Sequence, residues 1–329
     1  MRICRKEADG IMKRLYIAMY HYVRDLKNSR YPGIKGLDYR LFKEQLQFFA
    51  QRFRTVTMED VIAYYQEGKE LPENALLLTF DDGYIDHYTF AYPMLLEYGM
   101  QGSFFIPAKV FTEHTLLDVN KIHFILAAAP IETLCKELLA QMDKYRSEGW
   151  EYPSNQELME RYMVANRLND KETEFFKRVL QFVLPEQLRN KITSELFEKV
   201  LGVPETVMAH ELYLNYDQMM LMKKGGMYFG VHGYDHYWMN QLTREQLTED
   251  ITKALDCLQE LVNPNQWVIN YPCGSYSDEV IECIKKLGCV MGLTTDVQIV
   301  NLEKDDPFKL PRLDTIDFPP KSENYLNFL

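Results

Sequence analysis

Residues 75–83 read Ala-Leu-Leu-Leu-Thr-Phe-Asp-Asp-Gly, and this stretch decides the fold. Its apolar run predicts a buried β-strand that delivers two adjacent carboxylates, Asp81 and Asp82, onto a glycine. Because neighbouring side chains on an extended segment point to opposite faces, we expect the two carboxylates to have different environments. One can bind a metal ion while the other stays free as a base. A turn that merely caps a strand explains the same residues equally well, so the rest of the chain has to decide.

A second group of polar side chains follows the apolar run in residues 227–236, Met-Tyr-Phe-Gly-Val-His-Gly-Tyr-Asp-His. The spacing of His232 and His236 places both imidazoles on one side, whether the backbone is helical or extended. Two neutral imidazoles and one carboxylate leave a coordination position open for water, as in a hydrolytic zinc centre. The histidine pair alone also fits two packed, hydrogen-bonded rings. Together with the Asp-Asp strand end, it favours a metal site.

The segment Thr79-Phe80-Asp81-Asp82-Gly83 followed by His232-x-x-x-His236 resembles the polysaccharide deacetylase family, the NodB-homology carbohydrate esterases. The resemblance implies an α/β fold, a distorted (β/α) barrel of about seven parallel strands. It also implies that Asp81 is the general base and that Asp82, His232 and His236 hold one divalent metal. Zinc is the expected ion, and cobalt, nickel or manganese suit the same ligands.

The third motif of the family is matched by Asn270-Tyr271-Pro272-Cys273-Gly274. By the resemblance, the backbone N–H of Cys273 helps to form an oxyanion hole. The sequence departs from the common pattern here, because Asn270 stands where many members carry an arginine that orients the base. It departs a second time because no histidine follows His236, so the usual C-terminal acid is absent.

Two further segments resemble a circularly permuted subgroup of the family, such as the poly-N-acetylglucosamine deacetylases. Residues 15–21, Leu-Tyr-Ile-Ala-Met-Tyr-His, are similar to its Tyr-His segment, in which the acid-bearing strand comes first. This implies that His21 is the acid. Residues 308–314, Phe-Lys-Leu-Pro-Arg-Leu-Asp, resemble its Leu-Pro-Arg segment, which implies that Arg312 supplies the missing guanidinium.

The chain alternates predicted strands and helices, as a parallel barrel requires. Strands are predicted near 15–21, 75–80, 102–106, 227–232, 267–271, 289–294 and 308–313. The candidate residues lie at or near the carboxyl ends of these strands, where barrel enzymes place their chemistry. Residues 112–226 break the alternation and read as an inserted all-helical subdomain, between barrel segments 12–111 and 227–329. Its role as lid, acceptor wall, dimer surface or packing element is left open, and residues 1–11 are expected to be an extension without a role in the fold.

The composition limits the classes of protein to which this chain can belong. The 329 residues are 47% apolar, which allows one large core plus an extra subdomain. A net charge of −11 without any Lys/Arg-rich block argues against nucleic acid or anionic lipid as the main partner. The sequence has no apolar stretch of membrane-spanning length and no secretory signal pattern, so we expect a cytoplasmic protein. The six cysteines fit buried reduced thiols, and Cys273 fits a space-filling side chain better than a nucleophile.

The sequence therefore predicts a metal-dependent N-deacetylase that removes acetyl from an N-acetylated sugar or glycan precursor, in surface polysaccharide biosynthesis. One alternative is a small-molecule amidohydrolase or deformylase of the same fold. The other is a non-catalytic relative that binds metal and carbohydrate. The sequence leaves the sugar, the acyl position and the oligomeric state open.

Overall fold

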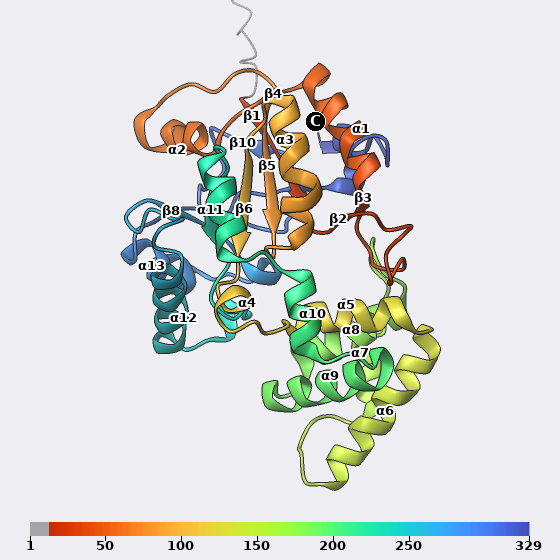
Figure 1. Ribbon diagram of the computed structural model, residues 1–329. Coiled ribbons are helices and arrows are strands. Elements are labelled where there is room, and N and C mark those ends of the chain that lie inside the picture. The colour runs from red at the N-terminus through yellow and green to blue at the C-terminus, as the bar shows by residue number, and fades with distance from the viewer. Residues whose placement is uncertain (1–12, 329) are drawn as a thin grey trace, which may run out of the picture.

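The computed structural model describes residues 13–328. A nine-stranded sheet lies at its centre, with the main strand order β10-β1-β5-β6-β7-β8-β9 (Figure 1). The strands from β1 to β9 in this order are parallel to one another. Their bounds are β1 Arg14–Tyr20, β5 Ala75–Asp81, β6 Gly102–Ile106, β7 Tyr228–Val231, β8 Trp267–Asn270 and β9 Cys289–Leu293.

Four short strands either pair with this sheet or form a small sheet of their own. β4 (Arg54–Thr55) pairs with β5, and β10 (Val300–Asn301) is antiparallel to β1. β2 (Val23–Arg24) and β3 (Leu37–Asp38) form a separate parallel pair. All seven residues of β5 are buried, as expected of a central parallel strand that is covered on both faces.

The last strand closes the sheet into a barrel. Leu310 forms a parallel bridge with Leu293 of β9, and β11 (Leu313–Asp314) pairs in parallel with β1. The segment after β10 thus fills the gap between the two edges, which confirms the predicted distorted (β/α) barrel. The continuous strand predicted over 308–313 is wrong in extent, because Pro311 has no backbone N–H to donate to a ladder.

Helices surround the strands on the outside (Figure 1). They are α1 Tyr39–Arg52, α2 Met58–Glu67, α3 Tyr92–Tyr98, α12 Arg244–Cys257 and α13 Asp278–Lys286. α12 begins at a capping box, in which the Thr243 side chain accepts from the Gln246 N–H and Gln246 accepts from the Thr243 N–H. It buries Leu247 and Ile251 and packs against α13.

The chain between β6 and β7 is helical, as predicted. It contains α4 Lys109–Thr112, α5 Asp118–Ala128, α6 Ile131–Ser147, α7 Asn155–Tyr162, α8 Lys171–Arg178, α9 Glu186–Leu201, α10 Glu205–Leu212 and α11 Tyr216–Lys224. Helices α5 to α9 gather in a lobe below the carboxyl ends of β5 and β6 in Figure 1. α5 packs against α9, and α6 against α8. The domain bounds 12–111, 112–226 and 227–329 stay predictions, and the proposed extension 1–11 lies outside the described residues.

Among the described residues, every helix is too short or too polar to cross a membrane.

Two histidines within these packed layers have unusually low pKa values. His87 follows β5, packs its ring near Phe80 and Phe104, and donates from Nε2 to the His21 carbonyl at 2.8 Å. His123 lies on α5 with its Nδ1 3.3 Å from the Tyr22 hydroxyl. Burial lowers the pKa of His87 to about 4 and that of His123 to about 3. Both rings are therefore neutral at physiological pH.

These two histidines predict a loss of stability in mild acid. A histidine in the unfolded chain has a pKa of about 6.5, so unfolding takes up protons below that pH while the folded rings stay neutral until about pH 4. The free energy of unfolding should fall as the pH decreases from 6.5 towards 4, by up to about 1.4 kcal/mol per pH unit for each ring. Urea denaturation of the metal-free protein at several pH values measures this slope. A double variant with His87→Gln and His123→Gln should have a flatter profile, and an unchanged slope would contradict the assignment.

Candidate metal centre and active site

A sharp reversal separates the two acidic residues at the end of β5. Asp82 has φ 70° and Gly83 has φ 68°, both in the left-handed region. Glycine adopts this region freely, and aspartate is one of the few other residues that tolerate it. A Cβ atom on Gly83 would lie 3.0 Å from Cδ1 of Ile106, so the position favours glycine on two grounds. The reversal gives Asp81 and Asp82 different surroundings, as predicted.

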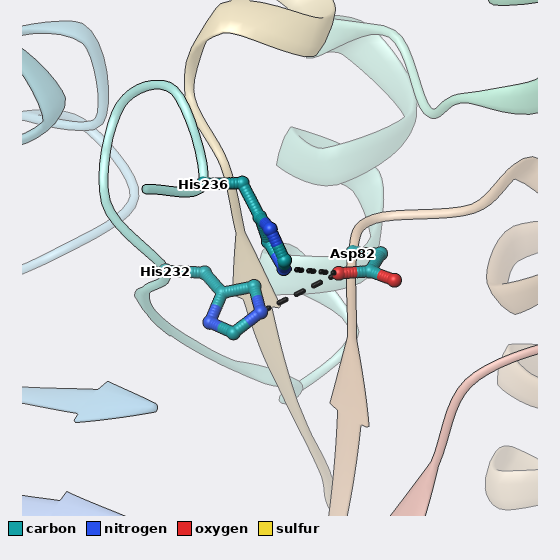
Figure 2. A group of neighbouring side chains, drawn as sticks. All are labelled: Asp82, His232 and His236. Atoms are coloured by element: carbon teal, nitrogen blue, oxygen red, sulfur yellow. Dashed lines mark ion pairs between the residues drawn. The ribbon is translucent and has the colours of Figure 1, made fainter. Parts of the chain in front are cut away.

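Asp82 faces the two predicted histidines (Figure 2). Its Oδ1 atom lies 3.4 Å from Nε2 of His232 and 3.4 Å from Nε2 of His236. One ligand atom from each residue lies within 4.8 Å of the other two. Tetrahedral zinc with bonds of about 2.0–2.1 Å separates its ligand atoms by about 3.3 Å, so the spacing suits such an ion.

Two further observations fit a cation at this position. Asp82 Oδ1 is buried and has no hydrogen-bond partner within residues 13–328, which leaves a negative charge to be compensated. His232 donates from Nδ1 to the Asn270 carbonyl at 2.6 Å, so its Nε2 carries the free lone pair. The side chains present therefore fit a divalent metal, and Asp82, His232 and His236 come together as the sequence predicted.

The loop that carries both histidines is held by α12. Asp250 accepts from the backbone N–H of Tyr234 at 2.9 Å and of Asp235 at 3.1 Å. A Cβ atom on Gly233, which has φ 72°, would lie 2.9 Å from the Asp250 carboxylate. Sequence reasoning missed Asp250, because a single acid on a charged helix gives no signal of its contact.

Asp81 is held by the guanidinium of Arg312, and both side chains are buried. Nη1 donates to Asp81 Oδ1 at 3.0 Å, and Nη2 donates to Oδ2 at 2.9 Å. Nη2 also donates to the side chain of Asn270 at 2.9 Å, and Nε donates to the Thr294 carbonyl at 2.8 Å. Position 270 carries Asn instead of Arg, and the guanidinium that contacts Asp81 comes from Arg312 in the closing segment. The side chain of Asn270 accepts a hydrogen bond from this guanidinium.

This pair fixes the charge of Asp81. Burial alone would raise the pKa of Asp81, but the positive charge of Arg312, with His21 and His232, outweighs that effect and holds the pKa below its ordinary value. Asp81 is consequently ionised at neutral pH.

His21 and Cys273 complete the predicted set. His21 follows β1, with Nε2 3.6 Å from Asp81 Oδ2 and 38% of its side chain exposed. Cys273 lies in the turn after β8 with φ 55°. Burial raises the pKa of Cys273 to about 12, so its thiol is protonated at neutral pH and unsuited to nucleophilic attack. Both residues lie at the carboxyl ends of their strands, and their catalytic roles stay predictions.

A buried hydrogen-bond chain, which sequence reasoning missed, joins Asp82 to the helices between β6 and β7. The Tyr84 hydroxyl donates to Asp82 Oδ2 at 2.5 Å, and Asn120 of α5 donates to the Tyr84 hydroxyl at 2.7 Å. The Tyr213 hydroxyl in turn donates to Asn120 Oδ1. All four side chains are buried. The only sequence signal was that Tyr84 directly follows the motif and that Asn120 interrupts an apolar stretch.

A cavity of about 200 Å³ adjoins the metal centre. His236, Trp238 and Cys273 line it from the barrel, and Leu180 and Arg189 line it from the helices. Substrate atoms in this cavity would contact both parts of the chain.

The hydrogen bond from Tyr84 predicts a second-sphere effect on metal affinity. Tyr84→Phe removes the donor to Asp82 Oδ2 and should weaken zinc binding by about 10- to 100-fold, because such partners orient the ligand. Competition with a fluorescent chelator measures the affinity. Tyr20→Phe is a matched control, since it deletes a buried tyrosine hydroxyl that is bonded to Gln45 instead. Equal zinc affinity in Tyr84→Phe and wild type would show that this bond does not position Asp82.

Comparisons with known proteins show the family of this chain and its fold. Residues 68–174 and 190–292 match the family model described as polysaccharide deacetylase. The Bacillus subtilis (strain 168) protein YxkH is 19% identical over 284 residues, which cover 86% of this chain and 65% of that protein. The chain thus spans about two thirds of the length of this curated relative.

Solved structures share the fold at low sequence identity. The deacetylase PplD of Streptococcus pyogenes, in complex with acetate, is 19% identical with a TM-score of 0.56, over 96% of this chain and 98% of that one. IcaB from Ammonifex degensii is 18% identical with a TM-score of 0.56, over 95% of each chain. Because the family model matches well over half of its residues, this chain belongs to the polysaccharide deacetylase family.

Proposed function

We propose that this chain is a metal-dependent N-deacetylase, which removes the acetyl group from an N-acetylated sugar or glycan precursor in surface polysaccharide biosynthesis. One observation carries the proposal: the carboxylate of Asp81, held by Arg312, lies beside a three-ligand site made by Asp82, His232 and His236. Membership of the polysaccharide deacetylase family supports the same reaction class.

The proposed site divides the hydrolysis of an amide among its residues. A divalent ion bound by Asp82, His232 and His236, for which zinc is our first choice, would polarise the amide carbonyl and lower the pKa of a water molecule. Asp81 accepts the proton of the attacking water, and Arg312 holds its carboxylate in one orientation through two parallel hydrogen bonds.

Two further groups complete the proposed reaction. The backbone N–H of Cys273 donates to the oxygen that gains negative charge, a contact that typically contributes on the order of 3 kcal/mol to transition-state stability. His21, which is partly exposed and lies next to Asp81, gives a proton to the departing nitrogen. The products are acetate and a free amino sugar.

Replacing the proposed base tests catalysis apart from metal binding. Asp81→Asn should lower acetate release from N-acetylhexosamine substrates by about 10²- to 10⁴-fold, because the water loses its proton acceptor. Zinc content should stay at the wild-type level, since Asp81 is not among the three ligands. Acetate is measured enzymatically and zinc by elemental analysis. Asp217→Asn, an exposed change on α11, is the control. Wild-type turnover in Asp81→Asn would rule out this role.

Replacing the proposed acid should have an effect that depends on the leaving group. His21→Ala should reduce kcat by about 10²-fold or more for a sugar acetamide, whose amine needs a proton to depart. The loss should be much smaller for an acetylated nitroaniline, whose leaving group is far less basic. Parallel kcat measurements on both substrates check this, and equal losses on the two would remove His21 from the step.

A further inference from the structure

The cavity beside the metal centre continues into a second one. The second cavity, of about 460 Å³, is lined by residues that include Phe182, Leu184 and Gln241. Four residues line both cavities, namely Glu186, Arg189, Tyr237 and Trp238. The two spaces therefore adjoin along one groove between the barrel, the π-helical turn Val179–Val183 and helix α9. Arg189 lies at their shared wall and lines the same cavity as His236.

Most charged side chains that line the cavity beside the metal centre are paired with an opposite charge within the protein. Lys109 pairs with Asp235 at 2.5 Å. Lys121 pairs with Asp118 at 3.0 Å and with Glu205 at 2.7 Å. These lysines have their counter-ions and are poorly placed to bind another anion.

Arg189 differs from these lysines. Its guanidinium, which is half-buried, has no carboxylate within 4.0 Å and no hydrogen bond within residues 13–328. Glu186 is three residues earlier on α9, but its side chain is exposed to water. A partly desolvated cation without a counter-ion costs free energy unless a ligand supplies the charge.

Lys177 of α8 is a second uncompensated cation, although it lines neither of the two cavities. It is half-buried and also lacks a carboxylate within 4.0 Å in the described part of the chain. The nearby Glu174 is already bonded to Arg178 at 2.6 Å. Burial lowers the pKa of Lys177, and its positive charge, with those of Arg178 and Arg189, acts on the Cys273 thiol. Lys177 and Arg189 therefore both lie near the third motif.

We propose that Arg189, with Lys177 adding positive charge nearby, forms a subsite for an anionic group of the substrate, a phosphate or a carboxylate, next to the N-acetyl group that is hydrolysed. The inference rests on the proposed deacetylase function and narrows its substrate class to acidic or phosphorylated N-acetyl sugars. Arginine offers paired donors that match the oxygens of either anion, and lysine adds a point charge. The subsite stands out in a protein whose net charge is −11.

Binding to the zinc-loaded full chain tests this subsite without turnover. An Asp81→Asn background prevents hydrolysis. The probes for calorimetry are N-acetylglucosamine 1-phosphate, N-acetylmuramic acid, which carries a carboxylate, and uncharged N-acetylglucosamine. At least one anionic probe should bind about tenfold or more tightly than the neutral sugar, and the preference should fall as salt increases. The anionic probe that binds more tightly shows whether the subsite prefers a phosphate or a carboxylate.

Variants assign the preference to the two side chains. Adding Lys177→Gln and Arg189→Gln together should abolish the preference while the affinity for the neutral sugar changes less than twofold. Adding Arg189→Lys alone should retain part of it. Arg178→Gln is the matched control, because Arg178 is already paired with Glu174. Thermal unfolding confirms that each variant is folded.

Two outcomes overturn the proposal: anionic and neutral probes that bind alike or not at all, or a preference that survives the double substitution. Failure of the deacetylase proposal would appear separately, as the absence of acetate release from all three sugars by the enzyme with Asp81 intact.

Discussion

The buried ion pair between Arg312 and Asp81 is the interaction on which the site depends. Taking both charges out of water is costly, and the cost is offset because the guanidinium also donates to Thr294 and Asn270. The pair thereby joins β5, β8, β9 and the segment that closes the barrel. Removing one partner of such a pair typically costs about 3–5 kcal/mol, since it leaves an uncompensated charge in the interior. The charge state of Asp81 and the closure of the barrel are thus maintained by the same contacts.

Local patterns in the sequence predicted the parts of the site that lie on single segments. Asp81 and Asp82 end an apolar strand, and His232 and His236 follow another, so their positions follow from spacing and from the parallel order of the strands. The contact of Arg312 with Asp81 was reached only through the resemblance to a permuted subgroup. The closing strand was predicted too long, because Pro311 leaves the apolar pattern of the segment intact although it has no backbone N–H for a hydrogen-bond ladder.

Contacts between distant segments could not be predicted from one sequence. Asp250 holds the histidine loop from α12, and Asn120 reaches Tyr84 from α5, yet each looks like an ordinary polar residue of a helix. Each of them acts through a hydrogen bond to a residue that is distant in the sequence. The position of Arg189 could not be predicted either, because an arginine on a helix normally faces solvent. Only the structure shows that Arg189 lines the groove.

The helices between β6 and β7 are connected to Asp82 by buried hydrogen bonds. The chain from Asp82 through Tyr84 to Asn120 and Tyr213 is buried and its hydrogen bonds are formed. A lid that swung away with α5 would have to break these bonds in the interior, where an unsatisfied polar group costs about 1–3 kcal/mol. These contacts favour a fixed wall for α5 over the lid that the sequence left open.

The closure of the barrel also sets the order in which the protein can mature. β1, which precedes His21, is made long before β11 and Arg312, although β1 and β11 are neighbours in the sheet. During synthesis β1 therefore lacks one partner, and Asp81 lacks its guanidinium, until the closing segment has emerged. A nascent chain that has not yet reached Arg312 cannot place Asp81 in its native surroundings, so the buried ion pair can form only after the closing segment has left the ribosome.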